Sequence, residues 1–230
     1  MINFYSEWAK FKGEGISESS FIEEFLGKSN LSIQALANSN VDDAKEAFAF
    51  ILNLDISKFV NKFKYQEGLD STDVPQFSSL DAALISIPLA LENLKEYVSF
   101  KEVGRMLIDT KEDLARMKYG ENHSKVCADC SFVQIDKINN KSRVKITNFG
   151  KASTFFSKED VYKVAAAMLC RNKLIQNLIF KAKTGKVSFK DEVPFLSDST
   201  LGRRKSNVKA IVELVLSHSG NFDLMKNIEW

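Results

Sequence analysis

The strongest constraint on the fold is a short β-signal that lies between helical segments. Residues 133–138 alternate apolar and polar side chains, and residues 143–147 alternate again. Asn139 and Asn140 separate the two runs, and asparagine tolerates the positive φ angles that a two-residue hairpin turn requires. This pattern predicts a β-hairpin. In the flanking segments apolar side chains recur at intervals of three and four, so we expect a mainly α fold with small β-hairpins.

The first 76 residues are expected to form an acidic helical N-terminal domain. Apolar residues of segment 41–53 share one helical face, and a polar loop over 66–76 supplies the boundary. Residues 1–100 contain 8 Lys and Arg against 15 Asp and Glu, a net charge of −7. The aromatic side chains near the start are expected to pack in the core rather than to bind a ligand; they are Phe4, Tyr5, Trp8 and Phe11.

An internal repeat organises the rest of the chain. Residues 98–103 recur, with one extra residue, at 187–193, which is 89 positions later. Each copy follows an amphipathic helical segment and precedes a basic helix, expected over 119–131 and over 199–217. Three helices followed by a hairpin is the plan of a winged helix. The helical N-terminal body is therefore expected to precede two winged-helix units, over residues 77–155 and 156–230.

The charge of this second part indicates a polyanionic partner. Residues 101–230 contain 24 Lys and Arg against 15 Asp and Glu, a net charge of +9. In a winged helix the third helix enters the major groove of DNA, and the hairpin, or wing, contacts the backbone or the minor groove. Lysine and arginine neutralise phosphates, whereas asparagine can pair with adenine. The candidate DNA contacts of the first unit are Lys118, Asn122, His123, Ser124 and Lys125 on the helix and Lys137, Lys141 and Arg143 on the wing.

The second unit has the denser basic helix and the weaker wing. Only residues 221–225 alternate as a strand would, so one strand of the second wing is expected there and its partner strand is missing. Cations gather in the first turns of the helix, where the helix dipole disfavours them and an anionic partner would relieve the repulsion. Its candidate DNA contacts are Thr200, Arg203, Arg204, Lys205, Asn207 and Lys209.

Three segments resemble the tandem winged-helix modules of bacterial restriction endonucleases and related defence proteins. They are residues 118–125, with Tyr119-Gly120, residues 145–150, with Ile146-Thr147 and Gly150, and residues 199–208, with Arg203-Arg204. In that family such motifs open the first recognition helix, close the wing and open the second recognition helix. The resemblance covers roughly residues 80–220 and implies a sequence-specific double-stranded DNA-binding protein, either the recognition component of a restriction or phage-defence system or a transcription regulator. It leaves the acidic half unexplained.

Other chemistries find less support in the sequence. His123, Cys127 and Cys130 have spacings that could share a helix face, but structural zinc needs four ligands, so buried reduced thiols are favoured and no metal or cofactor is expected. No strand carries the clustered carboxylates and lysine of a nuclease, and no phosphate-binding glycine loop occurs, so the chain as it stands is expected not to be an enzyme. A nuclease, ATPase or methyltransferase partner would supply catalysis. The alternative is a protein-interaction module with a winged-helix fold and no DNA readout.

The sequence also bears on location. No apolar run approaches the roughly 20 residues that a membrane-spanning helix needs, and the first residues lack the basic and apolar regions of a signal peptide. We therefore expect a cytoplasmic protein that does not bind membranes.

Overall fold

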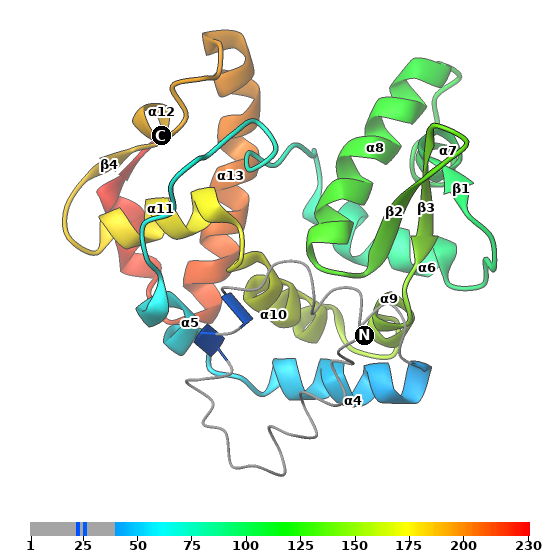
Figure 1. The fold of residues 1–230 in the computed structure, drawn as a ribbon, viewed down its shortest axis with the longest axis horizontal. Helices are drawn as coiled ribbons and strands as arrows, with labels where there is room; N and C mark the ends of the chain where they lie inside the picture. The colour runs from blue at the N-terminus through cyan, green and yellow to red at the C-terminus, as the bar shows by residue number, and fades with distance from the viewer. Residues whose placement is uncertain (1–21, 24, 27–39) are drawn as a thin grey trace. The chain divides into compact units, whose positions relative to one another are not determined.

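The computed structural model describes residues 22–23, 25–26 and 40–230, and helices predominate over a small amount of β-structure (Figure 1). This confirms the mainly α fold class and the small antiparallel sheet. The four aromatic residues expected to pack near the start of the chain lie outside the described residues. Within the described part, no helix is both long enough and apolar enough to cross a membrane.

Two compact units share the described chain, and each contains one part of the expected N-terminal domain. The first unit comprises residues 40–52 and 77–165, and the second comprises residues 22–23, 25–26, 53–76 and 166–230. This division differs from the expected boundaries after residues 76 and 155. The reason is packing, because the apolar faces of neighbouring N-terminal helices are buried in different units.

The first unit consists of helices and one three-stranded sheet. Its elements are α4 (Val41–Leu52), the π-helix η1 (Ala82–Ser86), α6 (Ile87–Leu91), β1 (Val98–Ser99), α7 (Phe100–Leu107), α8 (Asp113–Asp129), β2 (Val133–Ile138), β3 (Lys141–Ile146) and α9 (Asn148–Ser153). Helix α10 (Lys158–Leu169) begins in this unit and ends in the second. The strands are antiparallel, and β3 lies between β1 and β2.

Helix α4 is part of the core of the first unit. The ring of Phe48 lies 5.3 Å from that of Phe149 in α9 and 4.3 Å from that of Phe156, measured between ring centroids. Phe132, which precedes β2, completes the cluster at 6.3 Å. The predicted apolar face of segment 41–53 is therefore confirmed, and it covers the elements that follow the hairpin.

Helices α7 and α8 cross at two glycines. A Cβ atom added at Gly104 would lie 1.9 Å from the carbonyl oxygen of Arg116, and one added at Gly120 would lie 1.9 Å from that of Phe100. Real Cβ atoms do not approach backbone atoms so closely. The two helices therefore pack backbone to backbone, and α7 begins with a capping box in which Ser99 and Glu102 bond each other's backbone N–H.

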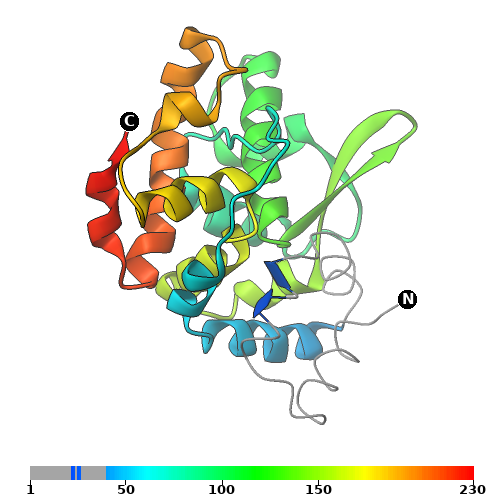
Figure 2. The ribbon, with the colours of Figure 1, turned by 60° about the vertical axis from the view of Figure 1, so that its left-hand side comes forward.

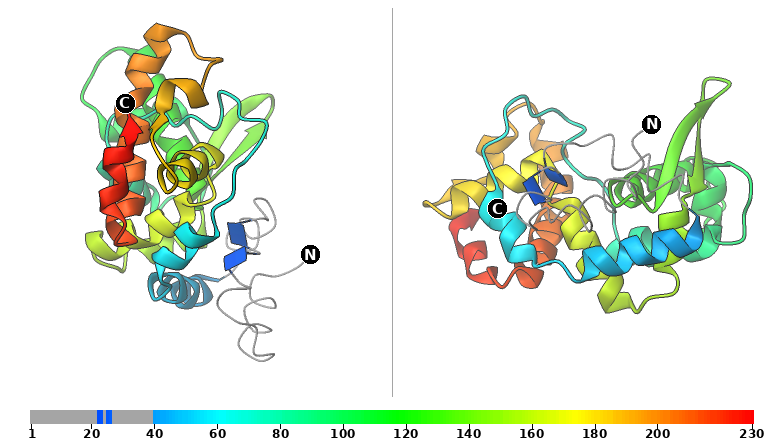
Figure 3. Two further views of the ribbon diagram at one scale, coloured as in Figure 1. Left: turned by 90° about the vertical axis from the view of Figure 1, so that its left-hand side faces the viewer. Right: turned by 60° about the horizontal axis from the view of Figure 1, so that its bottom comes forward.

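The predicted hairpin is confirmed. Strands β2 and β3 pair from Val133–Ile146 to Ile138–Lys141, and Asn139 (φ 50°) and Asn140 (φ 59°) form the turn. Figures 2 and 3 show this hairpin projecting from the helices of its unit. At its base, Thr147 accepts a hydrogen bond from the N–H of Gly150 and so caps α9.

The second unit has a similar beginning and a different end. Its elements are α5 (Ile56–Lys62), α11 (Lys173–Ala182), β4 (Val187–Ser188), α12 (Phe189–Glu192), α13 (Asp198–His218), the 3₁₀ helix η2 (Phe222–Asn227) and β5 (Ile228–Glu229). Strands β4 and β5 pair in parallel. The strand predicted over 221–225 is therefore wrong. The Asn221 N–H bonds the carbonyl of Leu216, and the Leu224 N–H bonds that of Asn221, so local turn bonding takes these residues out of a ladder.

The sequence repeat corresponds to a structural repeat in the first three of its four elements. In each copy a helix precedes a two-residue strand, a short helix begins at the next residue, Phe100 or Phe189, and a long helix follows. The copies differ after the long helix, because a hairpin follows α8 whereas η2 and a single short strand follow α13. No hairpin wing therefore occurs in the described second unit.

Candidate nucleic-acid interface

Helix α8 presents a mixed surface rather than a basic one. Lys118 and Lys125 are exposed and Asn122 is half-buried, and their spacing of four and three places them on one helical face. Lys125 Nζ lies 2.6 Å from a carboxylate oxygen of Glu121, which neutralises part of that face. Lys118 makes no ion pair with any described residue. Helix α8 therefore offers one unpaired cation and one amide for contact with DNA.

His123 and Ser124 do not belong to this surface, and their prediction as DNA contacts is wrong. His123 is 1% exposed and Ser124 is fully buried, because both lie on the side of α8 that packs against the rest of its unit. His123 Nε2 accepts hydrogen bonds from the backbone N–H groups of Ser78 (3.1 Å) and Ser79 (3.3 Å). Nδ1 lies 2.8 Å from the carbonyl oxygen of Tyr119 and donates to it.

The buried imidazole holds the chain that leads into η1. Ser79, whose N–H it accepts, in turn accepts the Ala82 N–H with its hydroxyl. Burial lowers the pKa of His123, although its bond to the Tyr119 carbonyl acts in the opposite direction. The neutral ring with a proton on Nδ1 satisfies all these bonds, so His123 has a structural role.

The cysteines near His123 are also interior residues. Cys127, Cys130 and Cys170 are all free and buried. Burial raises the pKa of the Cys127 thiol well above its ordinary value, which disfavours the thiolate needed for metal binding. Among the residues that the structure describes, no group of three or more His, Cys, Asp or Glu side chains could hold a metal ion.

The hairpin carries the clearest concentration of accessible positive charge in the first unit. Lys137 and Lys141 are exposed near its tip and make no ion pair with any described residue. Because side chains alternate between the two faces of a strand, Lys141, Arg143 and Lys145 line one face of β3. Arg143 lies 3.7 Å from a carboxylate oxygen of Glu102, at long range for an ion pair. All three predicted wing residues are therefore within reach of a ligand.

The only carboxylate on that face of the hairpin is engaged by its neighbours. Asp136 pairs with Arg143 in the β-ladder, and its Oδ2 accepts hydrogen bonds from the hydroxyl of Tyr97 (2.6 Å) and the amide of Gln134 (2.8 Å). The bond to Asp136 raises the pKa of Tyr97, so the phenol remains a neutral donor. Lys145 Nζ lies 5.4 Å from the centre of the Tyr97 ring.

A hollow of about 350 Å³ lies at the base of this face. Lys95, Lys145 and Lys151 line it together with polar and apolar side chains: Leu94, Gln134, Ile146 and Asn148. The sequence analysis did not select these lysines. The repeating cations of β3 could have pointed to Lys145, but Lys95 and Lys151 reach the hollow only through the fold.

The basic residues of α13 are largely occupied within the second unit. Arg204 Nη1 donates to the carbonyl oxygens of Ser71 (3.0 Å) and Val74 (2.5 Å), and burial and the neighbouring Arg203 lower its pKa. Lys205 Nζ donates to the carbonyl oxygen of Trp230 at 2.7 Å. Arg204 and Lys205 thus tie other segments of their own unit to α13, which the sequence analysis interpreted as DNA contacts.

The other predicted residues of α13 differ in exposure. Asn207 is 7% exposed, so its prediction as a base-reading residue is wrong. Arg203 is exposed but bends back to the carbonyl of Ser199 (3.2 Å) and to the hydroxyl of Thr200 (3.3 Å). Lys209 is exposed and lies 3.9 Å from Glu213. Of the six predicted residues, Arg203 and Lys209 are the ones with exposed side chains.

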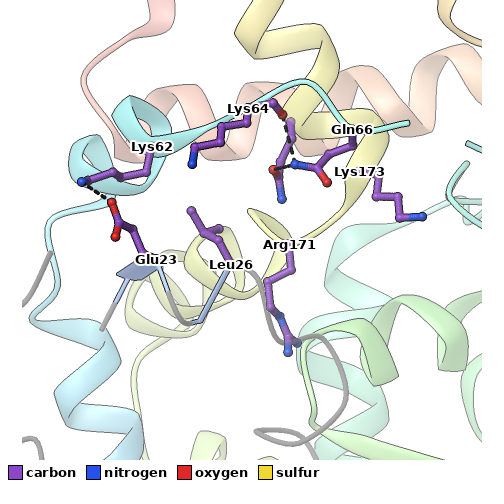
Figure 4. Close-up of a pocket in the computed structure, with 8 residues that line it drawn as sticks. Glu23, Leu26, Lys62, Lys64, Gln66, Arg171 and Lys173 are labelled. Atoms are coloured by element: carbon purple, nitrogen blue, oxygen red, sulfur yellow. Dashed lines mark hydrogen bonds and ion pairs between the residues drawn. The ribbon is translucent and has the colours of Figure 1, made fainter. Parts of the chain in front are cut away.

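The second unit also contains a cavity of about 290 Å³ that the sequence did not predict (Figure 4). Lys62 Nζ lies 2.5 Å from a carboxylate oxygen of Glu23 at one side of it. Figure 4 shows that Arg171 and Lys173 extend away from that pair in different directions. Gln66 and Gln176 bond each other at 3.0 Å across its wall. Its cations do not converge on a common point.

No family model, curated protein or solved structure matches this chain. Its function is therefore argued from the interface itself.

Proposed function

We propose that the protein is a sequence-specific double-stranded DNA-binding protein whose binding surface lies in the first unit. The observation that carries this proposal is the order of elements from η1 to β3. Three helical segments lead into a hairpin, and β1 adds a third strand to the same sheet. This order fits the plan of a winged helix, with α8 as the recognition helix and β2–β3 as the wing.

The distribution of charge supports binding to the phosphate backbone through the wing. Lys137 and Lys141 are exposed and unpaired among the described residues, and Arg143 has one distant carboxylate partner. Such cations can neutralise phosphates at any sequence, and they gain affinity from the release of counterions. Affinity would therefore come chiefly from the hairpin.

Sequence readout would come from α8. Asn122 is the side chain on its accessible face with both a donor and an acceptor, which is the pattern that can bond adenine twice. Lys118 lies one turn away and can contact a phosphate or a guanine. The second unit is not part of the proposed readout, because Arg204, Lys205 and Asn207 are engaged or buried.

The biological setting follows from the resemblance in sequence rather than from the fold. The proposed protein acts in a bacterial cytoplasm as the recognition component of a restriction or phage-defence system, or as a transcription regulator. A nuclease, ATPase or methyltransferase partner would provide catalysis in the first case. The chain itself is proposed to have no enzymatic activity.

One observation favours the second candidate, a protein-interaction module. Leu114 (58% exposed) and Met117 (42%) lie at the beginning of α8, and Met106 (45%) lies at the end of α7. Exposed apolar side chains at a helix end suit a protein partner better than a phosphate backbone. In that case Asn122→Ala and Arg203→Lys would both have little effect on binding.

A fluorescence anisotropy titration with labelled duplexes tests the proposal. Between about 50 and 200 mM salt, log K should fall linearly with log salt, at a slope of roughly one per neutralised phosphate. Asn122→Ala should reduce discrimination between duplexes by about 1 to 3 kcal/mol per lost bidentate contact. Asn61→Ala changes an exposed asparagine of the second unit and serves as the matched control. Absence of binding to any duplex, or binding that is independent of salt, would contradict the proposal.

A further inference from the structure

The hollow at the base of the hairpin has the size and the chemistry of a small ligand site. Its volume of about 350 Å³ lies at the lower end of the range for ligand pockets. Three of its seven lining side chains are lysines, and none is a carboxylate. Lys145 and Lys151 are half-buried, and Lys95 is exposed, so the hollow is open to solvent on one side.

No carboxylate compensates for these three charges in the described part of the chain. Lys95, Lys145 and Lys151 make no ion pair there, although Lys145 lies near the ring of Tyr97. Like charges that share a site repel each other, and the repulsion grows as water is excluded. A purely structural cluster would be expected to include an acidic partner.

The nearest acidic groups of this region are directed elsewhere. The Asp136 carboxylate is held by Tyr97 and Gln134, on the outer face of the hairpin. Glu92, in the segment after α6, accepts a hydrogen bond from the hydroxyl of Thr154 at 2.9 Å. Both contacts leave the lysines of the hollow available to an external anion.

We propose that this hollow binds a phosphate group, and that the group belongs to the backbone of the bound duplex. This inference rests on the proposed function. Lys145 connects the hollow to the row of cations on β3, which continues through Arg143 to Lys141 at the turn. A DNA strand that follows this row would place one phosphate in the hollow and others along the hairpin. The hairpin would then hold DNA along the whole length of β3 and not at its tip alone.

The test removes two charges from the hollow without touching the tip of the hairpin. The variant is Lys95→Gln with Lys151→Gln, and the charge-matched control is Lys186→Gln with Lys226→Gln, two exposed lysines of the second unit. The double variant should lower the magnitude of the salt slope by about one and weaken all duplexes alike. The control should leave the slope unchanged, and Lys95→Arg with Lys151→Arg should retain most of the binding. Thermal melts verify that each variant is folded.

The same proteins are titrated with inorganic phosphate and with a mononucleotide, followed by thermal stabilisation. If the wild type binds DNA and the double Gln variant matches it in slope and affinity, the phosphate site is overturned while the proposed function stands. If no duplex binds but phosphate or the nucleotide stabilises the wild type and not the double variant, the site stands as one for a free phosphate compound and the proposed function fails. If neither DNA nor phosphate binds, both are overturned.

Discussion

The two units use the same opening elements to different ends. In the first, β1, α7 and α8 lead into a hairpin whose cations face solvent. In the second, β4, α12 and α13 lead into η2, and the cations of α13 bond carbonyl oxygens of their own unit. The sequence of α13 is the more basic of the two long helices. A run of cations therefore indicates a binding surface only when the fold leaves those cations without partners.

The largest expected effect concerns the helix crossing that only the first unit contains. Gly120→Ala would place a Cβ atom 1.9 Å from the Phe100 carbonyl oxygen, so α7 and α8 must separate. We expect a loss of about 3 kcal/mol or more in the free energy of unfolding, measured by urea denaturation.

Gly202→Ala in α13 is the matched control. Nothing lies within 4 Å of the Cβ atom that this change adds, and alanine is the better helix former. It should therefore stabilise the protein by up to about 1 kcal/mol. Equal effects at the two glycines would mean that the two helices are packed alike.

The hairpin should govern the electrostatic part of DNA binding. Replacing Lys137, Lys141 and Arg143 with alanine should lower the magnitude of the salt slope by up to about 3, at roughly one per phosphate contact. The ratio of specific to nonspecific affinity should remain nearly constant, because phosphates are alike at every base pair. A wing variant that lost discrimination at an unchanged slope would show that the hairpin reads bases.

Arg204 should behave in the opposite way. Arg204→Met removes the donor that bonds the carbonyls of Ser71 and Val74, and it should cost about 1 to 2 kcal/mol of unfolding free energy. The salt slope of DNA binding should not change. Arg203→Met, at an exposed neighbour, is the control and should alter stability by less than about 0.5 kcal/mol. A lower salt slope in Arg204→Met would return α13 to the DNA interface.

The smallest effect is a pH dependence that arises in the first unit. The pKa of His123 is lowered in the folded protein, so the unfolded chain binds the proton more readily. Stability should be complete above the unfolded pKa of about 6.5 and should fall as the pH drops toward the folded pKa, by at most about 1.4 kcal/mol per pH unit. His123→Gln should remove this component, and His218→Gln should retain it. Parallel pH profiles for wild type and His123→Gln would contradict the assignment.

The sequence predicted local structure better than it predicted the site. Alternation and the Asn139-Asn140 pair determine the hairpin because register and turn depend on neighbouring residues alone. The role of Arg204 depends on carbonyl groups more than 120 positions earlier, which no local pattern reveals. His123 was misassigned for the same reason, since its partners Ser78 and Ser79 belong to another segment. Strand 221–225 failed because apolar residues in so short a stretch suit a 3₁₀ turn equally well.

The contact between α4 and the aromatic cluster has a consequence for synthesis of the protein. Phe48 leaves the ribosome about 100 residues before Phe149 and Phe156, the rings against which it packs. At typical translation rates this interval lasts about 5 to 20 seconds, during which the apolar face of α4 has no native partner. The nascent chain therefore carries an exposed phenylalanine face for most of its elongation, which makes α4 the segment where a chaperone that binds apolar helices would have the longest opportunity to act.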